Sequence, residues 1–403
     1  MPGEETEPAI PQGFRAAGVK AGIKPSGGLD LAVLAAERPC SAAGTFTTNR
    51  VCAAPVKWDR AIVPSPRVRG VVVNAGNANA ATGATGEANA RRTAEHAASA
   101  LGCQADEVLV ASTGVIGHQL PMDRVETGIH AAVAALSADA ASFQTASQAI
   151  LTTDTRPKLV SLRREIDGRP VTLLGMAKGA AMIGPRMATM LAFLFTDAQV
   201  QPGVLQAILT GAIDYSFNCI SVEGHTSTND TVLLLASGAS GARVEEQNTS
   251  SVVDFSRMVL EVCLSLARMI PADGEGATHL ITIDVEGCRD RDEARALARA
   301  VADSPLVKTA IHGADPNWGR IISAAGYAGY DFEESEVSLW LNGVALYREG
   351  SPLDFDAAAV SASLRANHET FIRLVFRRGD ASILFWTCDL TAEYIRLNAD
   401  YTT

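Results

Sequence analysis

The amino-acid sequence predicts a layered α/β fold with mixed sheets. Short apolar runs rich in branched residues, with Gly, Asn or Asp nearby, are typical of strands. Other segments repeat apolar residues at three- and four-residue spacing, which is typical of helices. The strands outnumber what helix-covered βαβ units would need and are irregularly spaced, so a doubly wound domain is not expected. With 403 residues, 47% of them hydrophobic, the chain can fill a large core.

Eight segments fit strands, and in chain order they are 71–74, 108–112, 171–176, 190–195, 280–285, 337–341, 371–376 and 383–387. Six segments fit helices, and they are 88–101, 125–136, 204–213, 252–270, 292–301 and 357–365. Residues 137–150 are polar and rich in alanine, which predicts a helix or a loop. Residues 238–251 are small and polar, and we expect them to form an exposed connection.

The composition narrows the classes of function. A net charge of −11 disfavours binding to nucleic acid or to anionic membranes. The longest apolar runs, such as 190–195 and 231–236, are too short to cross a membrane. The N-terminal stretch is acidic and rich in proline, unlike a secretory signal. We therefore expect a cytoplasmic protein that acts on small molecules.

Common catalytic and metal-binding motifs are absent from the sequence. It contains no Walker A sequence, no HExxH, no GxSxG and no strand-borne GxGxxG. Its seven cysteines are widely spaced without a CxxC, which disfavours a zinc site and a disulfide framework. None of the seven histidines belongs to a recognisable metal cluster. A nucleophile must be sought elsewhere.

Thr189 stands where an irregular segment meets an apolar run. Gly179 and 184–185 interrupt regular structure, and 190–195 reads as a buried strand. From position alone, a threonine that begins a strand is the favoured interpretation. The functional interpretation requires a cut between Ala188 and Thr189. The new α-amine, with an ordinary pKa of about 7.7–8.0, could then serve as base for the hydroxyl of the same residue.

Ordered motifs run through nearly the whole chain, and they are GVKAGIKPSGGLDLAVLAAE (18–37), GTFTTNRVCAAPV (44–56), NAGNANAATG (74–83), ASTGVIG (111–117), LTTDTRPK (151–158), KGAAMIGPRMATMLAFLFTDA (178–198), SFNCISVEGHTSTNDT (216–231), DGEGATHL (273–280), VKTAIHGADPNWGR (307–320) and CDLTAEYIRLNADYTT (388–403). Together they resemble the ornithine acetyltransferase family, the glutamate N-acetyltransferases of arginine biosynthesis. So many matches in order make a chance likeness untenable.

The resemblance implies a fold of the ornithine acetyltransferase (DmpA-like) type, in which fragments 1–188 and 189–403 share one core. It implies self-cleavage between Ala188 and Thr189. Thr189 would then carry acetyl from N2-acetyl-L-ornithine to L-glutamate in a ping-pong reaction without a metal or an organic cofactor. Two copies of each fragment would form an α2β2 heterotetramer, with no nucleic-acid or membrane partner. Whether acetyl-CoA also serves as a donor stays open.

The resemblance also assigns roles around the nucleophile. Thr113 and Gly114, which alone would read as an ordinary turn, correspond to an oxyanion hole. A threonine of 151–158 binds substrate, and by position this is Thr152, with Thr153 as the near alternative. Lys178, which would otherwise be an ordinary surface lysine, is expected to hold a substrate carboxylate.

The later part of the chain contributes three further residues under the same resemblance. Glu275 contacts the amino group of ornithine or a catalytic water, although by itself it could be a plain loop charge. Asn398 and Thr403 line the substrate site, so the C-terminus should lie near Thr189 instead of fraying.

Ala81 replaces a cysteine common in relatives, which we expect to change only packing. Five further residues depart from what the family leads us to expect, and they are Ala180, Ala181, Gly184, Arg186 and His279. The first four could alter the rate of cleavage, and the fifth is not at a catalytic position. Two other functions stay open. One is an N-terminal-nucleophile aminopeptidase or amidase that uses water as acceptor. The other is a catalytically inactive homologue that binds amino acids.

Overall fold

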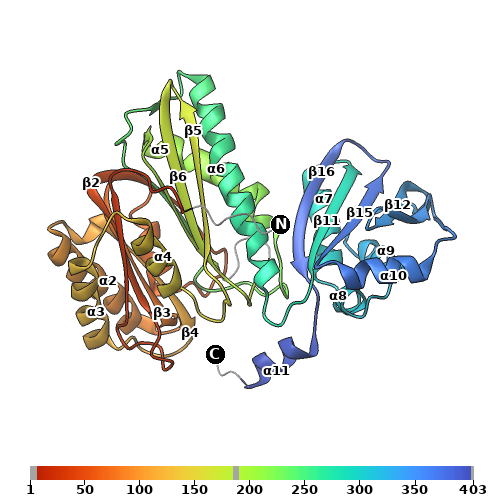
Figure 1. The fold of residues 1–403 in the computed structure, drawn as a ribbon, viewed down its shortest axis with the longest axis horizontal. Helices are drawn as coiled ribbons and strands as arrows, with labels where there is room; N and C mark the ends of the chain where they lie inside the picture. The colour runs from red at the N-terminus through yellow and green to blue at the C-terminus, as the bar shows by residue number, and fades with distance from the viewer. Residues whose placement is uncertain (1–6, 185–189, 401–403) are drawn as a thin grey trace.

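Two β-sheets organise the chain, each in its own lobe (Figure 1). The computed structural model describes residues 7–184 and 190–400. Within these residues, the first sheet has eight strands, in the order β4-β3-β2-β9-β7-β6-β5, with β1 paired to β2. Their bounds are β1 (Phe14–Val19), β2 (Leu31–Phe46), β3 (Ser65–Asn77), β4 (Val108–Val115), β5 (Lys158–Ile166), β6 (Arg169–Lys178), β7 (Leu191–Thr196) and β9 (Thr231–Ala236).

Helices cover both faces of the first sheet. These helices are α1 (Ala54–Arg60), α2 (Gly83–Leu101), α3 (Met122–Ala134), α4 (Ala140–Ala149), α5 (Pro202–Tyr215) and α6 (Thr249–Met269). Along β7, Phe193 and Phe195 share a core with Phe143 of α4. Ala192 and Leu194 point the other way, into the core that contains α5 and α6. A strand buried on both faces reads as a continuous apolar run, which explains its sequence.

The second sheet has the order β14-β13-β12-β15-β11-β16 within the described residues. Its strands are β11 (Leu280–Cys288), β12 (Val337–Leu341), β13 (Val344–Arg348), β14 (Ser351–Pro352), β15 (Glu369–Phe376) and β16 (Ala381–Cys388). One face packs against α7 (Arg291–Ala302), α8 (Pro305–His312), α9 (Trp318–Gly326) and α10 (Ala357–Ala366). On β15, buried Ile372 and Leu374 alternate with exposed Phe371 and Arg373. This alternation is typical of a sheet covered on one face.

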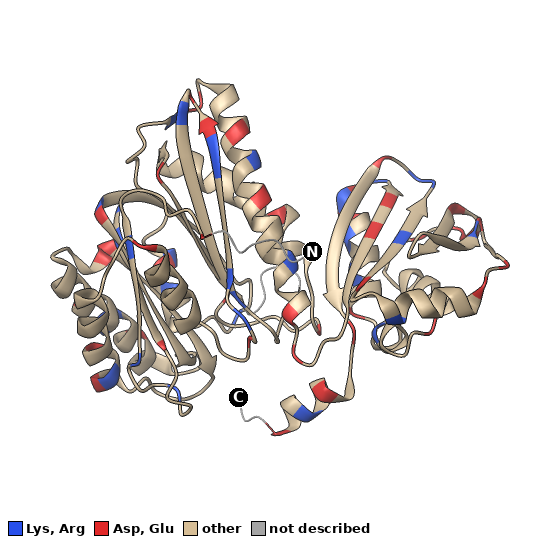
Figure 2. Ribbon diagram, viewed as in Figure 1, with Lys and Arg blue, Asp and Glu red and all other residues tan. Residues whose placement is uncertain are grey.

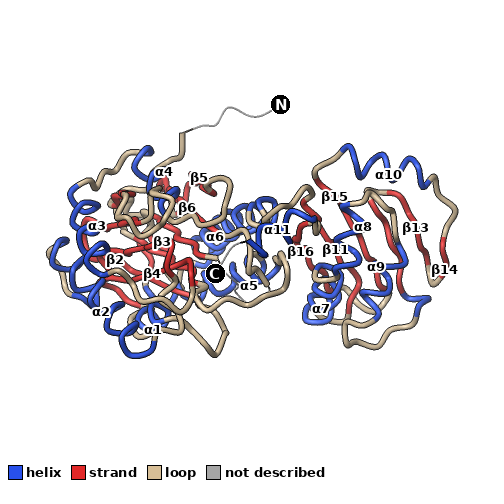
Figure 3. Tube along the Cα trace, turned by 90° about the horizontal axis from the view of Figure 1, so that it is seen from below, coloured by secondary structure: helices blue, strands red, loops and turns tan. Residues whose placement is uncertain are grey.

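The last helix, α11 (Ala392–Asp400), leaves β16 and returns toward the first lobe. Seen from below, it lies between the two sheets (Figure 3). A small pair of strands, β8 (Gln199–Val200) and β10 (Arg243–Val244), completes the described strands. Where the structure is described, no helix combines the length and the apolar character that a membrane span requires.

The predicted layered α/β architecture with mixed sheets is confirmed. All eight predicted strands and all six predicted helices overlap observed elements of the same type, and the strand expected at 190–195 begins one residue later, at Leu191. Residues 137–150 contain the helix α4. Residues 238–251 contain β10 and the start of α6 between stretches of loop. The predictions omit several short helices and the strands β1, β2, β5, β8, β9, β10, β13 and β14.

The centre of the first sheet comes from the later half of the chain. β7 pairs with β6 on one side and with β9 on the other, and β9 in turn pairs with β2. Strands from before and after residue 188 therefore share one sheet and one core. The predicted cut between Ala188 and Thr189 lies outside the described residues.

Candidate active site

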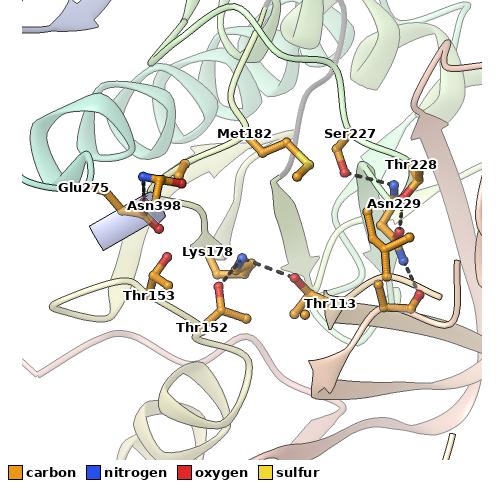
Figure 4. A pocket seen from close by; sticks show the side chains of 14 residues that line it. Thr113, Thr152, Thr153, Lys178, Met182, Ser227, Thr228, Asn229, Glu275 and Asn398 are labelled. Carbon is orange, nitrogen blue, oxygen red and sulfur yellow. Dashed lines mark hydrogen bonds between the residues drawn. The ribbon is translucent and has the colours of Figure 1, made fainter. Parts of the chain in front are cut away.

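A pocket opens where several loops of the first lobe meet α11 (Figure 4). Six predicted site residues line it, and they are Thr113, Gly114, Thr152, Lys178, Glu275 and Asn398. They come from the end of β4, the loop after α4, the end of β6, the turn after a short 3-10 helix (Pro271–Asp273), and α11. The fold thus gathers residues that are nearly 300 positions apart in sequence.

Gly114 brings a backbone amide close to the pocket. It pairs with Gly76 across β3 and β4, and its φ of +133° lies in a region that side chains rarely adopt. A Cβ at this position would lie 2.3 Å from the carbonyl carbon of Gly76. Only glycine fits this close approach, and Gly114 lines the pocket together with Thr113, its neighbour in the chain.

Lys178 lies at the centre of the hydrogen bonds within the pocket. Its buried Nζ donates to Thr152 Oγ1 at 2.8 Å and to Thr113 Oγ1 at 3.2 Å. A hydroxyl that accepts from an ammonium keeps its own hydrogen to donate elsewhere. Burial lowers the pKa of Lys178, and nearby Asp154 opposes this shift. The pocket therefore offers one ammonium and two hydroxyl donors, a combination that suits a carboxylate or an oxyanion.

Both candidate threonines of the loop after α4 line the pocket. Thr152 contacts Lys178 directly, whereas Thr153 lies nearer Glu275 and Asn398 (Figure 4). The choice of Thr152 as the substrate ligand stays a prediction, since either side chain can reach a molecule in the pocket.

The opposite wall of the pocket is formed by Glu275, in the turn before β11, and by Asn398 of α11. Asn398 Nδ2 donates to Glu275 Oε2 at 2.8 Å. Gly276, with a φ of +67°, lets the first turn of α11 pack closely, because a Cβ there would lie 2.6 Å from the backbone nitrogen of Tyr394. The helix thereby places Asn398 at the pocket. Thr403 lies outside the described residues.

The loop 221–230 holds both flanks of the segment that contains the predicted nucleophile. The carbonyl of Ile183 accepts from the amides of Val222 at 2.8 Å and Gly224 at 3.0 Å. The amide of Met190 donates to Asp230 Oδ1 at 3.0 Å. Ala188 and Thr189 themselves are not among the described residues, and their placement in the site stays a prediction.

The sequence did not indicate that the loop 221–230 also forms part of the pocket wall. Asn229 Nδ2 donates to the carbonyls of Ala78 at 2.6 Å and Ser112 at 2.8 Å, and so ties the ends of β3 and β4 to the loop. Seven further lining residues were not proposed as site residues from the sequence, and they are Ala78, Ile116, Ala181, Met182, Ser227, Thr228 and Asn229. Polar residues before β9 were a signal, but only the fold shows what they contact.

The residues that depart from the family pattern fall in different places. Ala180 is buried and Ala181 lines the pocket. Gly184 packs against Gly224, and a Cβ would lie 2.6 Å from its carbonyl carbon. His279 is not among the lining residues, and its ring contacts Asp389 and the carbonyl of Leu364 instead. Arg186 lies outside the described residues.

No group of His, Cys, Asp or Glu within residues 7–184 and 190–400 has the arrangement of a metal site. The described lining residues supply hydroxyls, amides, one ammonium and one carboxylate. These groups can bind a zwitterionic amino acid and stabilise a developing oxyanion.

The sequence model of the ArgJ family matches residues 15–403. An arginine biosynthesis bifunctional protein ArgJ from Rhodopirellula baltica is 45% identical over 399 residues, covering 99% of this chain and 97% of the relative. The protein of the same name from Symbiobacterium thermophilum is 46% identical and covers 98% of both chains. A crystal structure of ornithine acetyltransferase complexed with ornithine from Mycobacterium tuberculosis is 42% identical over 43% of this chain and 92% of that chain, with a TM-score of 0.39.

Proposed function

The chain belongs to the ArgJ family, and from this premise we propose that it transfers acetyl from N2-acetyl-L-ornithine to L-glutamate in arginine biosynthesis. The observation that carries the proposal is the convergence of Thr113, Gly114 and Lys178 on one pocket. These are the donors that acyl transfer between amino acids needs: two for the oxyanion and one for a carboxylate.

In the proposed reaction, the Thr189 hydroxyl attacks the acetyl carbonyl, and the α-amine of the same residue accepts its proton. The N–H of Gly114 and the hydroxyl of Thr113 stabilise the tetrahedral oxyanion. Its collapse breaks the C–N bond, protonated ornithine leaves, and the acetyl group stays on Thr189 Oγ1. The amine of glutamate then attacks this ester, and the reverse proton movements release N-acetylglutamate and restore the hydroxyl.

Substrate recognition follows from the charges of the pocket. Donor and acceptor share an α-carboxylate, which Lys178 and Thr152 would hold through charge-assisted and hydroxyl hydrogen bonds. Glu275, held by Asn398, would accept the amino group of ornithine or orient a catalytic water. Thr403 would complete this wall. The reaction as written uses no metal and no organic cofactor, and acetyl-CoA as a second donor is tested by initial rates with glutamate.

The nucleophile would arise by self-cleavage. The Thr189 hydroxyl attacks the carbonyl of Ala188, the peptide nitrogen becomes the free amine, and water opens the resulting ester. Fragments 1–188 and 189–403 would stay together, because β7 and β9 lie between β2 and β6 in one sheet. The α2β2 tetramer implied by the resemblance and the cytoplasmic location expected from the composition stay predictions.

Intact mass and acetyl-transfer assays on the wild type and Thr189→Ala test the proposal. We expect two fragments and activity from the wild type, and one inactive intact chain from the variant. Thr309→Ala, which removes an exposed hydroxyl from α8, should behave as the wild type does. A wild-type chain that stays intact and still transfers acetyl would refute the mechanism. Release of free acetate without transfer would favour the amidase alternative.

A further inference from the structure

A row of four buried charges with alternating signs runs behind the pocket. Lys178 Nζ lies 4.0 Å from Asp154 Oδ2, and Lys158 Nζ lies 2.8 Å from Asp154 Oδ1. Lys158 Nζ also lies 2.6 Å from Asp273 Oδ2. The side chains of all four are at most 3% exposed. Of these charges, only Lys178 lines the pocket.

Asp154 binds the backbone on both sides of the Lys178–Thr152 pair. Its Oδ1 accepts from the amide of Gly179 at 2.6 Å, directly after Lys178 in the chain. Its Oδ2 accepts from the amide of Thr152 at 3.2 Å. One carboxylate therefore fixes the end of β6 and the loop after α4, the two segments that supply the ammonium and a hydroxyl to the pocket.

The far end of the row reaches the opposite wall. Asp273 lies two residues before Glu275, and its Oδ2 accepts from the amide of Thr155 at 3.2 Å. Lys158 joins this carboxylate to Asp154. The row thus connects the lysine wall of the pocket to the turn that carries Glu275.

We propose that Asp154 is a positioning residue for acetyl transfer, which holds the Lys178 ammonium and the Thr152 hydroxyl where the substrate carboxylate binds. This inference rests on the proposed function of the pocket. Asp154 does not line the pocket, so it acts through Lys178 and Thr152. Removal of one partner from a buried set of charges leaves the others uncompensated, and a displaced binding group weakens catalysis strongly.

The charge states give this proposal a specific signature. Burial raises the pKa of Asp154, but Lys178 and Lys158 outweigh burial and lower the pKa to about 2. Asp154 is therefore ionised at every pH where the protein would be assayed. Burial lowers the pKa of Lys178, Asp154 raises it, and Lys158 lowers it. The two neighbours thus pull the protonation of Lys178 in opposite directions.

The experiment measures kcat/KM for N2-acetyl-L-ornithine from mildly acidic to alkaline pH in the wild type, Asp154→Asn and Lys158→Gln. Asp154→Asn should lower kcat/KM about 100-fold, the scale of loss when a binding group is displaced. On the alkaline side of the pH profile, kcat/KM falls where Lys178 loses its proton. In Asp154→Asn, this fall (the alkaline limb) should move to lower pH. Lys158→Gln should move the same limb to higher pH. A purely structural ion pair predicts no such opposite movements.

Glu293→Gln is the matched control, since it also replaces a buried carboxylate by its amide. Glu293 lies in α7 of the second lobe, is 1% exposed, and accepts from Arg378 Nε at 3.0 Å. Glu293→Gln should leave the alkaline limb of the pH profile unmoved even where it lowers stability, which ties the limb to the row of charges behind the pocket.

The outcomes separate this inference from the function on which it rests. An inactive wild type would overturn both. If the wild type is active, and folded Asp154→Asn has the same kcat/KM and the same pH profile, the positioning role alone is overturned. If Asp154→Asn fails to fold, Lys158→Gln decides the matter: an alkaline limb that moves upward supports the role, and an unmoved limb overturns it.

Discussion

The two sheets differ in how their strands are buried. Every residue of β7 and β9 in the first sheet is buried, because helices cover both faces. In β15 of the second sheet, buried residues alternate with more exposed ones, because the described helices cover one face. Figure 2 shows acidic and basic side chains on strands of the second sheet and on β5 and β6 of the first sheet, whereas the sequences of the central strands β7 and β9 contain no charged residue.

This difference indicates what each lobe contributes. The pocket residues at the ends of β4 and β6 stand on a sheet whose strands are held from both sides. Rigid support of this kind keeps binding groups in place. The second sheet supplies the turn with Glu275 and the root of α11 from its edge, while its open face is free to carry charge. Two predictions compare positions in the two sheets, and a third concerns the charged face of the second sheet.

The largest effect is expected for Phe193→Ala in β7, compared with Phe371→Ala in β15. Phe193 is 0% exposed and Phe371 is 51% exposed. Loss of a fully buried phenylalanine costs about 3–5 kcal/mol of unfolding free energy, from lost transfer energy and a residual cavity. The exposed one should cost well under half as much. Urea unfolding of both variants measures the difference, and equal losses would contradict the contrast between the sheets.

A smaller effect on stability but a large one on activity is expected for Gly114→Ala. Its Cβ would collide with the backbone of Gly76 and displace an oxyanion donor, and loss of one such donor lowers kcat about 10²–10³-fold. Gly343→Ala is the counterpart in the β12–β13 turn, also at positive φ but with nothing within 4 Å of the added Cβ. It should retain acetyl transfer. Comparable loss in both variants would mean that backbone strain alone causes the effect.

The smallest effect concerns the charged open face of the second sheet. Burial and a hydrogen bond with Glu286 raise the pKa of Asp284 to about 6. The folded state then holds a proton that the unfolded state, with a pKa of about 3.9, has released, so the stabilising contribution is lost as pH rises from about 4 to about 6. Asp284→Asn cannot lose this proton. Its Tm relative to the wild type should rise across that interval, and a constant difference would contradict the assignment.

Short apolar runs in the sequence predicted β11, β12, β15 and β16 of the second sheet, but missed β1, β2, β5 and β9 of the first. The sequence predicts a strand at 337–341, and β12 has these bounds, because its buried and half-buried residues alternate along it. β2 was not predicted. On one edge, its residues 31–36 pair with β1 and its residues 41–46 pair with β9. On the other edge, residues 31–35, 40 and 42 pair with β3, and exposed residues 37–39 interrupt the pattern. A strand that changes partners has no single repeat to recognise.

For the site as well, some residues were indicated by the sequence and others were found only in the structure. The resemblance indicated Thr113, Gly114 and Lys178, and all three line one pocket. Asn229 and Asp154 were not proposed, because their importance comes from carbonyls and amides that meet them only after folding. Local sequence carries the identity of a donor, whereas the partner that holds it in place is a property of the tertiary structure.

The position of β7 and β9 at the centre of the first sheet has a consequence for synthesis. β2 and β6 leave the ribosome before the two strands that lie between them. Until these arrive, the emerging chain exposes unpaired strand edges, which invite association with other chains. The β2–β9 pairing is also distant in sequence, and such pairing forms slowly. The complete chain is therefore the unit that folds. Cleavage of the chain before folding would leave two fragments, each with an incomplete sheet that must associate with the other.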